Sequence, residues 1–226
     1  MKKSVYGLAS CVAAALLVGC SQSATTPASD IATAIECSGV CGEQEFKLAQ
    51  QYHQGEQQQQ DLDKALANYI LAAKAGNVAA MTQVAVLYKE GLTSEGTKPE
   101  LAIDWLNAAA QQQDAQAQFL LAESYWNGEG VAQDFTQAEY WYNQAALNKD
   151  KEAAYLLGLR YFEGENMAED PVTGYVWMSI AALLGHPNAP GDRDFLIGEE
   201  LDMKQKKAAW QEVDRLIKQL DIEVPW

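Results

Sequence analysis

The chain has 226 residues, 48% of them hydrophobic, which suffices for one or two globular domains or for one elongated array. Its formal net charge of −15 at pH 7 argues against nucleic acid as a partner and against direct adhesion to anionic membrane faces. Composition says nothing sharper about the partner.

The N-terminal segment has the layout of a secretory signal. Two lysines follow Met1, and the eleven-residue apolar run Leu8–Val18 is too short to span a bilayer as a stable helix. The run ends in Leu17-Val18-Gly19-Cys20, which resembles a bacterial lipobox. The resemblance implies that residues 1–19 are a signal peptide and that Cys20 carries lipid. The alternative is an ordinary secretory signal with a chance cysteine.

A lipid on Cys20 would decide where the protein resides. Several acyl chains anchor a protein firmly, because each buried CH2 contributes about 0.8 kcal/mol. The next residue is Ser21 rather than the Asp that tends to retain such lipoproteins in the inner membrane of didermal bacteria. The resemblance therefore implies an outer-membrane lipoprotein that faces the periplasm. Loss of Lys2 and Lys3 with the signal would change the formal charge from −15 to −17.

Residues 20–43 join this anchor to the remainder of the chain. Residues 21–36 are rich in Ser, Thr and Ala, a composition typical of a mobile tether. Cys37 and Cys41 follow, and two such close cysteines in an oxidising periplasm favour a disulfide. They lack the four ligands of a structural zinc site, and their spacing differs from the C-x-x-C of thiol oxidoreductases. We expect a local disulfide staple, with a redox role as the alternative.

A repeat with a period of 36 or 37 residues begins after Cys41. Its tyrosines are Tyr52, Tyr88, Tyr125 and Tyr161. Three residues after each tyrosine stands a glycine: Gly55, Gly91, Gly128 and Gly164. A small residue follows ten or eleven positions later: Ala65, Ala102, Ala138 and Gly174. Chance does not hold register across four copies in this way.

Each copy predicts two packed helices. In the third copy, Trp141, Tyr142, Ala145 and Ala146 follow Ala138 at offsets 3, 4, 7 and 8, the stripe of one helical face. Small residues let two helices approach, and the aromatic rings fill the space between them. Each glycine suits the left-handed residue that ends a helix. The residues expected to cap the second helices are Asp61, Asp134, Asp170 and, before Pro99 in the second copy, Thr97.

This pattern resembles the Sel-one-like repeat, a relative of the tetratricopeptide repeat. Residues 117–146 match its pattern nearly in full, including Gly130-Val131. The resemblance implies an all-α, right-handed α-solenoid with repeats at about 44–78, 79–114, 115–150 and 151–189. The first two copies depart from the pattern in the turn between their helices, where residues 56–60 and 92–95 replace the usual ending.

Residues 190–226 do not continue the Tyr/Gly pattern. We expect them to form a capping helix pair, because a repeat array needs an end that covers its last apolar face. One helix is predicted from about Arg193 to Glu200. Asp202 is predicted to cap a second helix, which carries the apolar side chains of Val213, Leu216 and Leu220.

The sequence supports no catalytic residue, metal ligand set or cofactor. His53 and His186 are the two histidines of the chain, and each falls beside a repeat turn, where a solvated position is expected. Carboxylates in or near the turns, such as Glu129 and Glu163, follow no spacing that would face two of them across a substrate.

Three residues are candidates for partner binding. Trp105, Trp141 and Trp177 occupy equivalent positions and are predicted to lie in the core. The position of Trp126 varies between copies, with Phe162 one repeat later. Trp126 and Phe162 could form an exposed aromatic patch that anchors a partner. The alternative is that both cover the turn between helices. Glu129 is the third candidate because the repeat pattern does not explain it.

The leading function hypothesis is a non-catalytic scaffold or adaptor, tethered in the bacterial envelope, that presents its repeat surface to an unknown peptide or protein. The alternative is a hydrolase that acts on peptidoglycan or a β-lactam, as the resemblance to cysteine-rich relatives implies. Those relatives carry paired cysteines inside each repeat, and this chain has none there. That departure favours the scaffold.

Overall fold

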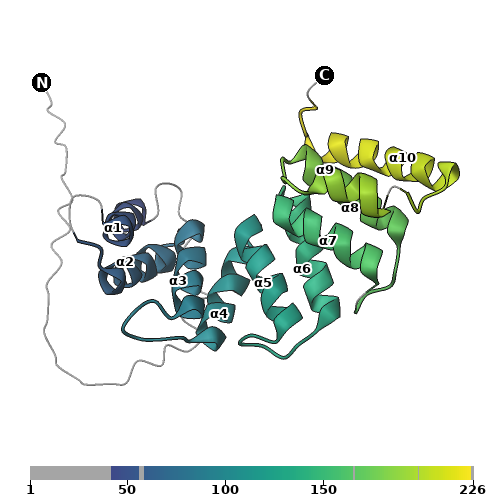
Figure 1. Cartoon of the computed structure of the whole chain (residues 1–226). Coiled ribbons are helices and arrows are strands. Elements are labelled where there is room, and N and C mark those ends of the chain that lie inside the picture. Colours follow the sequence, from purple (N-terminus) through teal and green to yellow (C-terminus); the bar gives the residue numbers. More distant parts are fainter. Residues whose placement is uncertain (1–41, 56–58, 165, 198, 225–226) are drawn as a thin grey trace, which may run out of the picture.

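The structure is a computed structural model that describes residues 42–55, 59–164, 166–197 and 199–224. Over these residues the chain is helical. Eight helices form four consecutive pairs: α1 (Glu43–Gln54) and α2 (Leu62–Lys74), α3 (Val78–Glu90) and α4 (Pro99–Ala110), α5 (Ala115–Asn127) and α6 (Phe135–Leu147), α7 (Lys151–Glu163) and α8 (Pro171–Leu183). Each helix packs against its neighbours in the chain, so the pairs follow one another as an α-solenoid (Figure 1). The fold class predicted from the sequence is confirmed.

The predicted glycines end the first helix of every pair. Gly55, Gly91, Gly128 and Gly164 are all left-handed C-caps, with φ between 65° and 73°. The residue at the N-cap of the second helix then donates its backbone N–H to the carbonyl oxygen of the repeat tyrosine, at 2.7–3.0 Å. The donors are Asp61, Lys98, Asp134 and Asp170, and the acceptors are Tyr52, Tyr88, Tyr125 and Tyr161. This backbone hydrogen bond closes the turn in all four repeats, whatever the length of the turn.

Side-chain caps confirm three of the four predicted helix starts. Asp61, Asp134 and Asp170 each accept backbone N–H bonds in the first turn of the following helix. The prediction of Thr97 as the cap of α4 is wrong. The N-cap of α4 is Lys98, and it makes no side-chain cap hydrogen bond. Pro99 explains the shift, because its fixed φ suits the first helical position and so leaves the N-cap to the residue before it.

Each helix pair carries a small residue at the same register position in both helices. These residues are Ala49 and Ala65, Ala85 and Ala102, Ala122 and Ala138, and Gly158 and Gly174, and all of these alanines are buried. In the last pair a Cβ on Gly158 would lie 3.1 Å from the carbonyl oxygen of Gly174, so α7 and α8 touch through their backbones.

The three equivalent tryptophans are not equally buried. Trp105 and Trp177 lie in the core, as predicted. Trp141 is only half-buried, which corrects that prediction. It packs at the edge of both core clusters, the one that runs through the first half of the array and the one that runs through the second. Its ring is also edge-on to the exposed Tyr140, with ring centroids 5.0 Å apart.

The C-terminal unit differs in part from the predicted helix pair. A four-residue helix, α9 (Ala189–Asp192), runs into a π-helical turn, Arg193–Ile197, in place of a helix from 193 to 200. The last helix, α10 (Met203–Leu220), starts at Asp202 as predicted, in a reciprocal capping box with Gln205. It packs on α8 (Figure 1). Its buried side chains are those of Ala209, Val213, Leu216 and Leu220. Within the part of the chain that the structure describes, no helix has the length and apolar character to cross a membrane.

Candidate functional site

The turn that follows α5 places Glu129 over the neighbouring repeat. Gly128 and Gly130 both have φ of 73°, a left-handed conformation, and Glu129 lies between them with its N–H bonded to the Ser124 carbonyl oxygen. A Cβ on Gly130 would lie only 2.6 Å from the carbonyl carbon of Pro99. The turn of the third repeat therefore rests directly on the start of α4 in the second repeat, and only glycine fits at the contact.

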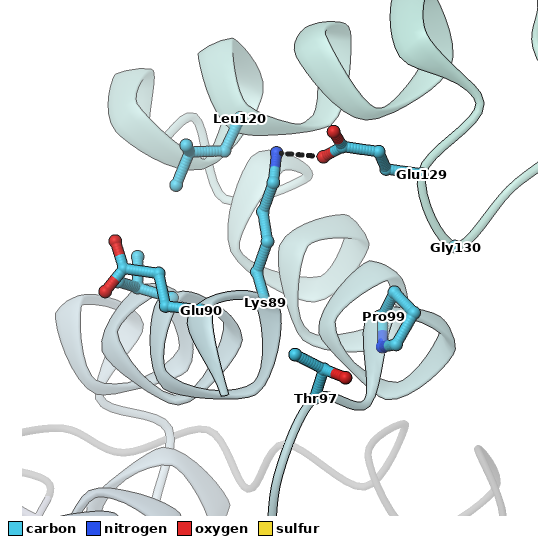
Figure 2. Close-up of a pocket in the computed structure, with 8 residues that line it drawn as sticks. Lys89, Glu90, Thr97, Pro99, Leu120, Glu129 and Gly130 are labelled. Atoms are coloured by element: carbon cyan, nitrogen blue, oxygen red, sulfur yellow. Dashed lines mark ion pairs between the residues drawn. The ribbon is translucent and has the colours of Figure 1, made fainter. Parts of the chain in front are cut away.

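Glu129 forms an ion pair between repeats. Its Oε2 lies 3.0 Å from Lys89 Nζ at the C-terminal end of α3 (Figure 2). The Glu129 side chain is about half exposed, so solvent screens the pair and the expected contribution to stability is small, well below 1 kcal/mol. The ion pair matters mainly because it holds the side chains of Lys89 and Glu129 at the rim of a hollow.

That hollow is a pocket of about 520 Å³ between the second and third repeats. Its apolar wall consists of Val86 from α3, Leu120 from α5 and Pro99 at the start of α4. Thr97, Gly130 and the charged groups of Lys89, Glu90 and Glu129 complete the lining (Figure 2). Of the sequence-predicted candidates, Glu129 is the one at this pocket.

Trp126 and Phe162 are held against the core. The Arg160 guanidinium carbon of the next repeat lies 3.4 Å from the centroid of the Trp126 ring, and the Phe135 ring packs edge-on at 4.9 Å. Phe162 packs beside Gly174, where a Cβ would lie 3.5 Å from its Cβ. Both aromatic side chains are half-buried. Their partner-binding role stays a prediction, and their structural contacts match the alternative in which they cover the turn.

A polar network that the repeat pattern did not indicate joins the third and fourth repeats. The Tyr142 hydroxyl donates to the carboxylate of Glu123, and Arg160 Nη2 donates to the Tyr142 oxygen at 3.1 Å. Burial raises the pKa of Glu123, while the positive charges of Arg160 and Lys89 act in the opposite direction. The only sequence signal was an acidic residue at the centre of the apolar helix α5.

A family comparison settles what kind of repeat carries this pocket. The model of the Sel1 repeat matches four consecutive segments, residues 45–77, 78–114, 115–150 and 151–186. The chain belongs to the Sel1 repeat family. Repeats of this type typically serve as protein-interaction scaffolds.

Solved structures resemble this Sel1 protein in fold. A Sel1 repeat protein from Oxalobacter formigenes superposes with a TM-score of 0.65 at 23% identity, over 77% of this chain and 72% of that chain. The protein c5321, a protective antigen present in uropathogenic Escherichia coli strains, has a TM-score of 0.54 at 23% identity. That match covers 79% of this chain and 46% of c5321. A comparison with curated protein sequences finds no match.

One histidine contradicts the expectation of a solvated position. His186 is buried and stacks on Tyr155, with ring centroids 3.9 Å apart, and its Nε2 lies 3.1 Å from Glu152 Oε2. Residue 186 lies between the end of α8 at Leu183 and the start of α9 at Ala189. His53 is half-buried, and its Nδ1 lies 3.3 Å from the Tyr69 hydroxyl oxygen. Neither histidine belongs to a cluster of three or more metal-ligating side chains among the described residues.

The remaining site predictions lie outside the described residues. They are the lipid attachment at Cys20 and the disulfide between Cys37 and Cys41. Both stay predictions.

Proposed function

We propose that this Sel1 repeat protein is a non-catalytic scaffold that binds a peptide or protein partner in the bacterial envelope. The observation that carries the proposal is the pocket between the second and third repeats. It is already formed, it has an apolar wall, and its rim bears fixed charges. Such a pocket suits one apolar side chain of a partner, with polar groups that orient the neighbouring backbone.

The charges at the rim favour a partner segment with a positive charge beside its apolar anchor. Glu90 and Glu129 contribute two carboxylates against the single ammonium of Lys89. The whole chain is also strongly acidic, with a formal charge of −15. Long-range attraction would therefore draw a basic segment toward the pocket and raise its association rate.

Photo-crosslinking in living cells tests the pocket directly. A photoreactive amino acid at Val86, which lines the pocket, should capture a defined partner. The matched control is the same amino acid at Leu71, which lies on α2 with 56% of its surface exposed. Equal capture at both positions, or none at Val86, would contradict partner binding at this pocket.

The envelope location is the second part of the proposal. Lipid on Cys20 would hold the scaffold at the periplasmic face of the outer membrane, and residues 21–36 would let it reach a partner there. We expect Cys20→Ala to leave the protein unprocessed and without lipid. Normal recovery of that variant in the outer-membrane fraction would refute the anchor without affecting the pocket proposal.

A further inference from the structure

Glu90 is the one charged side chain at the rim of the pocket that has no partner within the described part of the chain. It lines the pocket between the second and third repeats and is exposed. The other two charged groups of the rim neutralise one another, because Lys89 Nζ lies 3.0 Å from Glu129 Oε2. Figure 2 shows Glu90 on the opposite side of Lys89 from Glu129. The Glu90 side chain forms no hydrogen bond or ion pair with any residue that the structure describes, so the net charge of the rim is concentrated there.

The position of Glu90 in α3 makes its surroundings more negative still. Glu90 is the last residue of the helix, and Gly91 follows as the C-cap. The last carbonyl groups of a helix give that end a partial charge of roughly −0.5, so a carboxylate is unfavourable there and a cation is favourable. Lys89 has the favourable sign, but its ammonium group is paired with Glu129. The Glu90 carboxylate thus lies at a negative helix end without a cation paired to it in the described chain.

Glu90 lies one helical turn from the apolar wall of the pocket. Val86 precedes it by four residues on α3, which puts the two side chains on the same side of the helix, about 6 Å apart along the axis. In an extended segment, residues two apart point to the same side and are separated by about 7 Å. An extended partner with an apolar side chain on Val86 would therefore place the side chain two residues away beside Glu90.

We propose that Glu90 receives a lysine or arginine side chain of the partner, two residues from the apolar side chain that enters the pocket. This inference rests on the function proposed above and names the motif that the pocket recognises. A cation at Glu90 gains from the carboxylate and from the negative helix end together, and the ion pair between Lys89 and Glu129 stays intact. An acidic residue at the same position of the partner would be repelled by both.

The fourth repeat supplies a matched control for Glu90. Glu163 is the last residue of α7 and is followed by the C-cap Gly164, so it occupies the same register position as Glu90. It is also exposed, but it is not among the residues that line the pocket. Replacement of either glutamate by glutamine removes a carboxylate from a helix C-terminus, so neither variant should have a lower melting temperature than the wild type.

Peptide titrations followed by NMR test the inference on the isotope-labelled mature chain without lipid. The probes are the end-blocked heptapeptides Gly-Lys-Gly-Leu-Gly-Lys-Gly and Gly-Gln-Gly-Leu-Gly-Gln-Gly, which place Lys or Gln two residues from the Leu anchor in either chain direction. Signals of Val86, Leu120 and Gly130 report binding at the pocket, with peptide up to roughly 10 mM to cover millimolar affinities. At low ionic strength the lysine peptide should bind about threefold more tightly than the glutamine peptide, the effect of a partly exposed ion pair. Glu90→Gln should remove this preference, and Glu163→Gln should retain it.

Charge reversal completes the test. Glu90→Lys should invert the preference, so that Gly-Glu-Gly-Leu-Gly-Glu-Gly binds more tightly than the lysine peptide. Equal binding of the lysine and glutamine peptides to the wild type, or an unchanged preference in Glu90→Gln, would overturn the inference and leave the apolar pocket standing as the partner site. A preference that Glu163→Gln also removes would overturn it as well, because the effect would then belong to the net charge of the chain. No shift at Val86, Leu120 and Gly130 with any peptide would instead contradict the pocket itself, and the inference with it.

Discussion

Gly130 shows how a single residue without a side chain builds the candidate site. The turn after α5 can rest on Pro99 only because residue 130 has no Cβ and accepts a φ of 73°. That contact sets the height of Glu129 above α3, and so fixes the rim of the pocket. The repeat pattern does not explain Glu129, but it does contain Gly130, and Gly130 determines where Glu129 lies.

Substitution of Gly130 should lower the free energy of unfolding by more than the strain of a left-handed backbone alone. Gly130→Ala adds a clash with Pro99 to the strain of a positive φ, and we expect a loss of about 3 kcal/mol in the free energy of unfolding. Gly96→Ala is the matched control, because Gly96 has a φ of 69° with nothing within 4 Å of its Cβ position. It should lose only about 1 kcal/mol. Equal losses in urea denaturation would show that the contact with Pro99 is not tight.

Tyr161 should make the stability of the fourth repeat depend on alkaline pH. Burial, together with the hydrogen bond to the Glu139 carboxylate, raises the pKa of Tyr161 to about 12. The unfolded chain loses this proton near pH 10, so the stabilisation is fully present below pH 10 and is lost as pH rises toward about 12. The stability difference between wild type and Tyr161→Phe should therefore shrink over this interval. Denaturation at several pH values measures this difference, and Tyr140→Phe serves as an exposed control. A stability difference between wild type and Tyr161→Phe that stays constant with pH would contradict the account.

At the scale of elements, the repeat register predicts contacts within a helix pair better than contacts between pairs. The repeat pattern predicts Gly91 and Gly128 as helix C-caps and Asp134 as an N-cap, because each of these residues caps a helix next to it in the chain. Lys89 with Glu129, and Glu123 with Arg160, join different repeats through turns and helix ends that vary between copies. No periodic pattern in a single sequence specifies such pairs.

The remaining errors have local physical causes. Lys98 replaced Thr97 as a cap because Pro99 fixes the start of α4. His186 is buried because its ring stacks on Tyr155 of α7, a contact that the repeat spacing does not specify. Trp141 occupies the same register position as Trp105, yet Trp105 is buried and Trp141 is only half-buried. Position within a repeat therefore does not determine burial.

The crossing of α7 and α8 leaves no room for an added side chain. A Cβ on Gly158 would lie 3.1 Å from the Gly174 carbonyl oxygen and the Met178 backbone nitrogen. We expect Gly158→Ala to lower the free energy of unfolding by about 1–3 kcal/mol, although alanine normally favours a helix over glycine by about 1 kcal/mol. Gly191→Ala, in α9 with open space at its Cβ position, should be neutral or stabilising. If Gly158→Ala left the melting temperature unchanged, α7 and α8 would be able to move apart without loss of stability, which would contradict this prediction.

At the scale of the whole molecule, α10 closes the array. Its four buried side chains cover α8, which is the most apolar helix of the repeats. Deletion of residues 199–226 should lower the melting temperature and expose a dye-binding apolar surface that leads to aggregation. A truncated chain that remains a soluble monomer with the melting temperature of the full chain would show that α10 does not cap the array.

The central claim is that a partner docks between the second and third repeats. The most direct test measures how tightly the crosslinked partner segment binds to variants of the pocket. Isothermal titration would compare the wild type with Val86→Ser and Leu120→Gln, and with Leu71→Gln as the control outside the pocket. Melting temperatures of all variants would be measured in parallel. The account predicts at least tenfold weaker binding for both pocket variants, because each places a polar group against the apolar anchor, and unchanged binding for Leu71→Gln. Wild-type affinity in both folded pocket variants would contradict it.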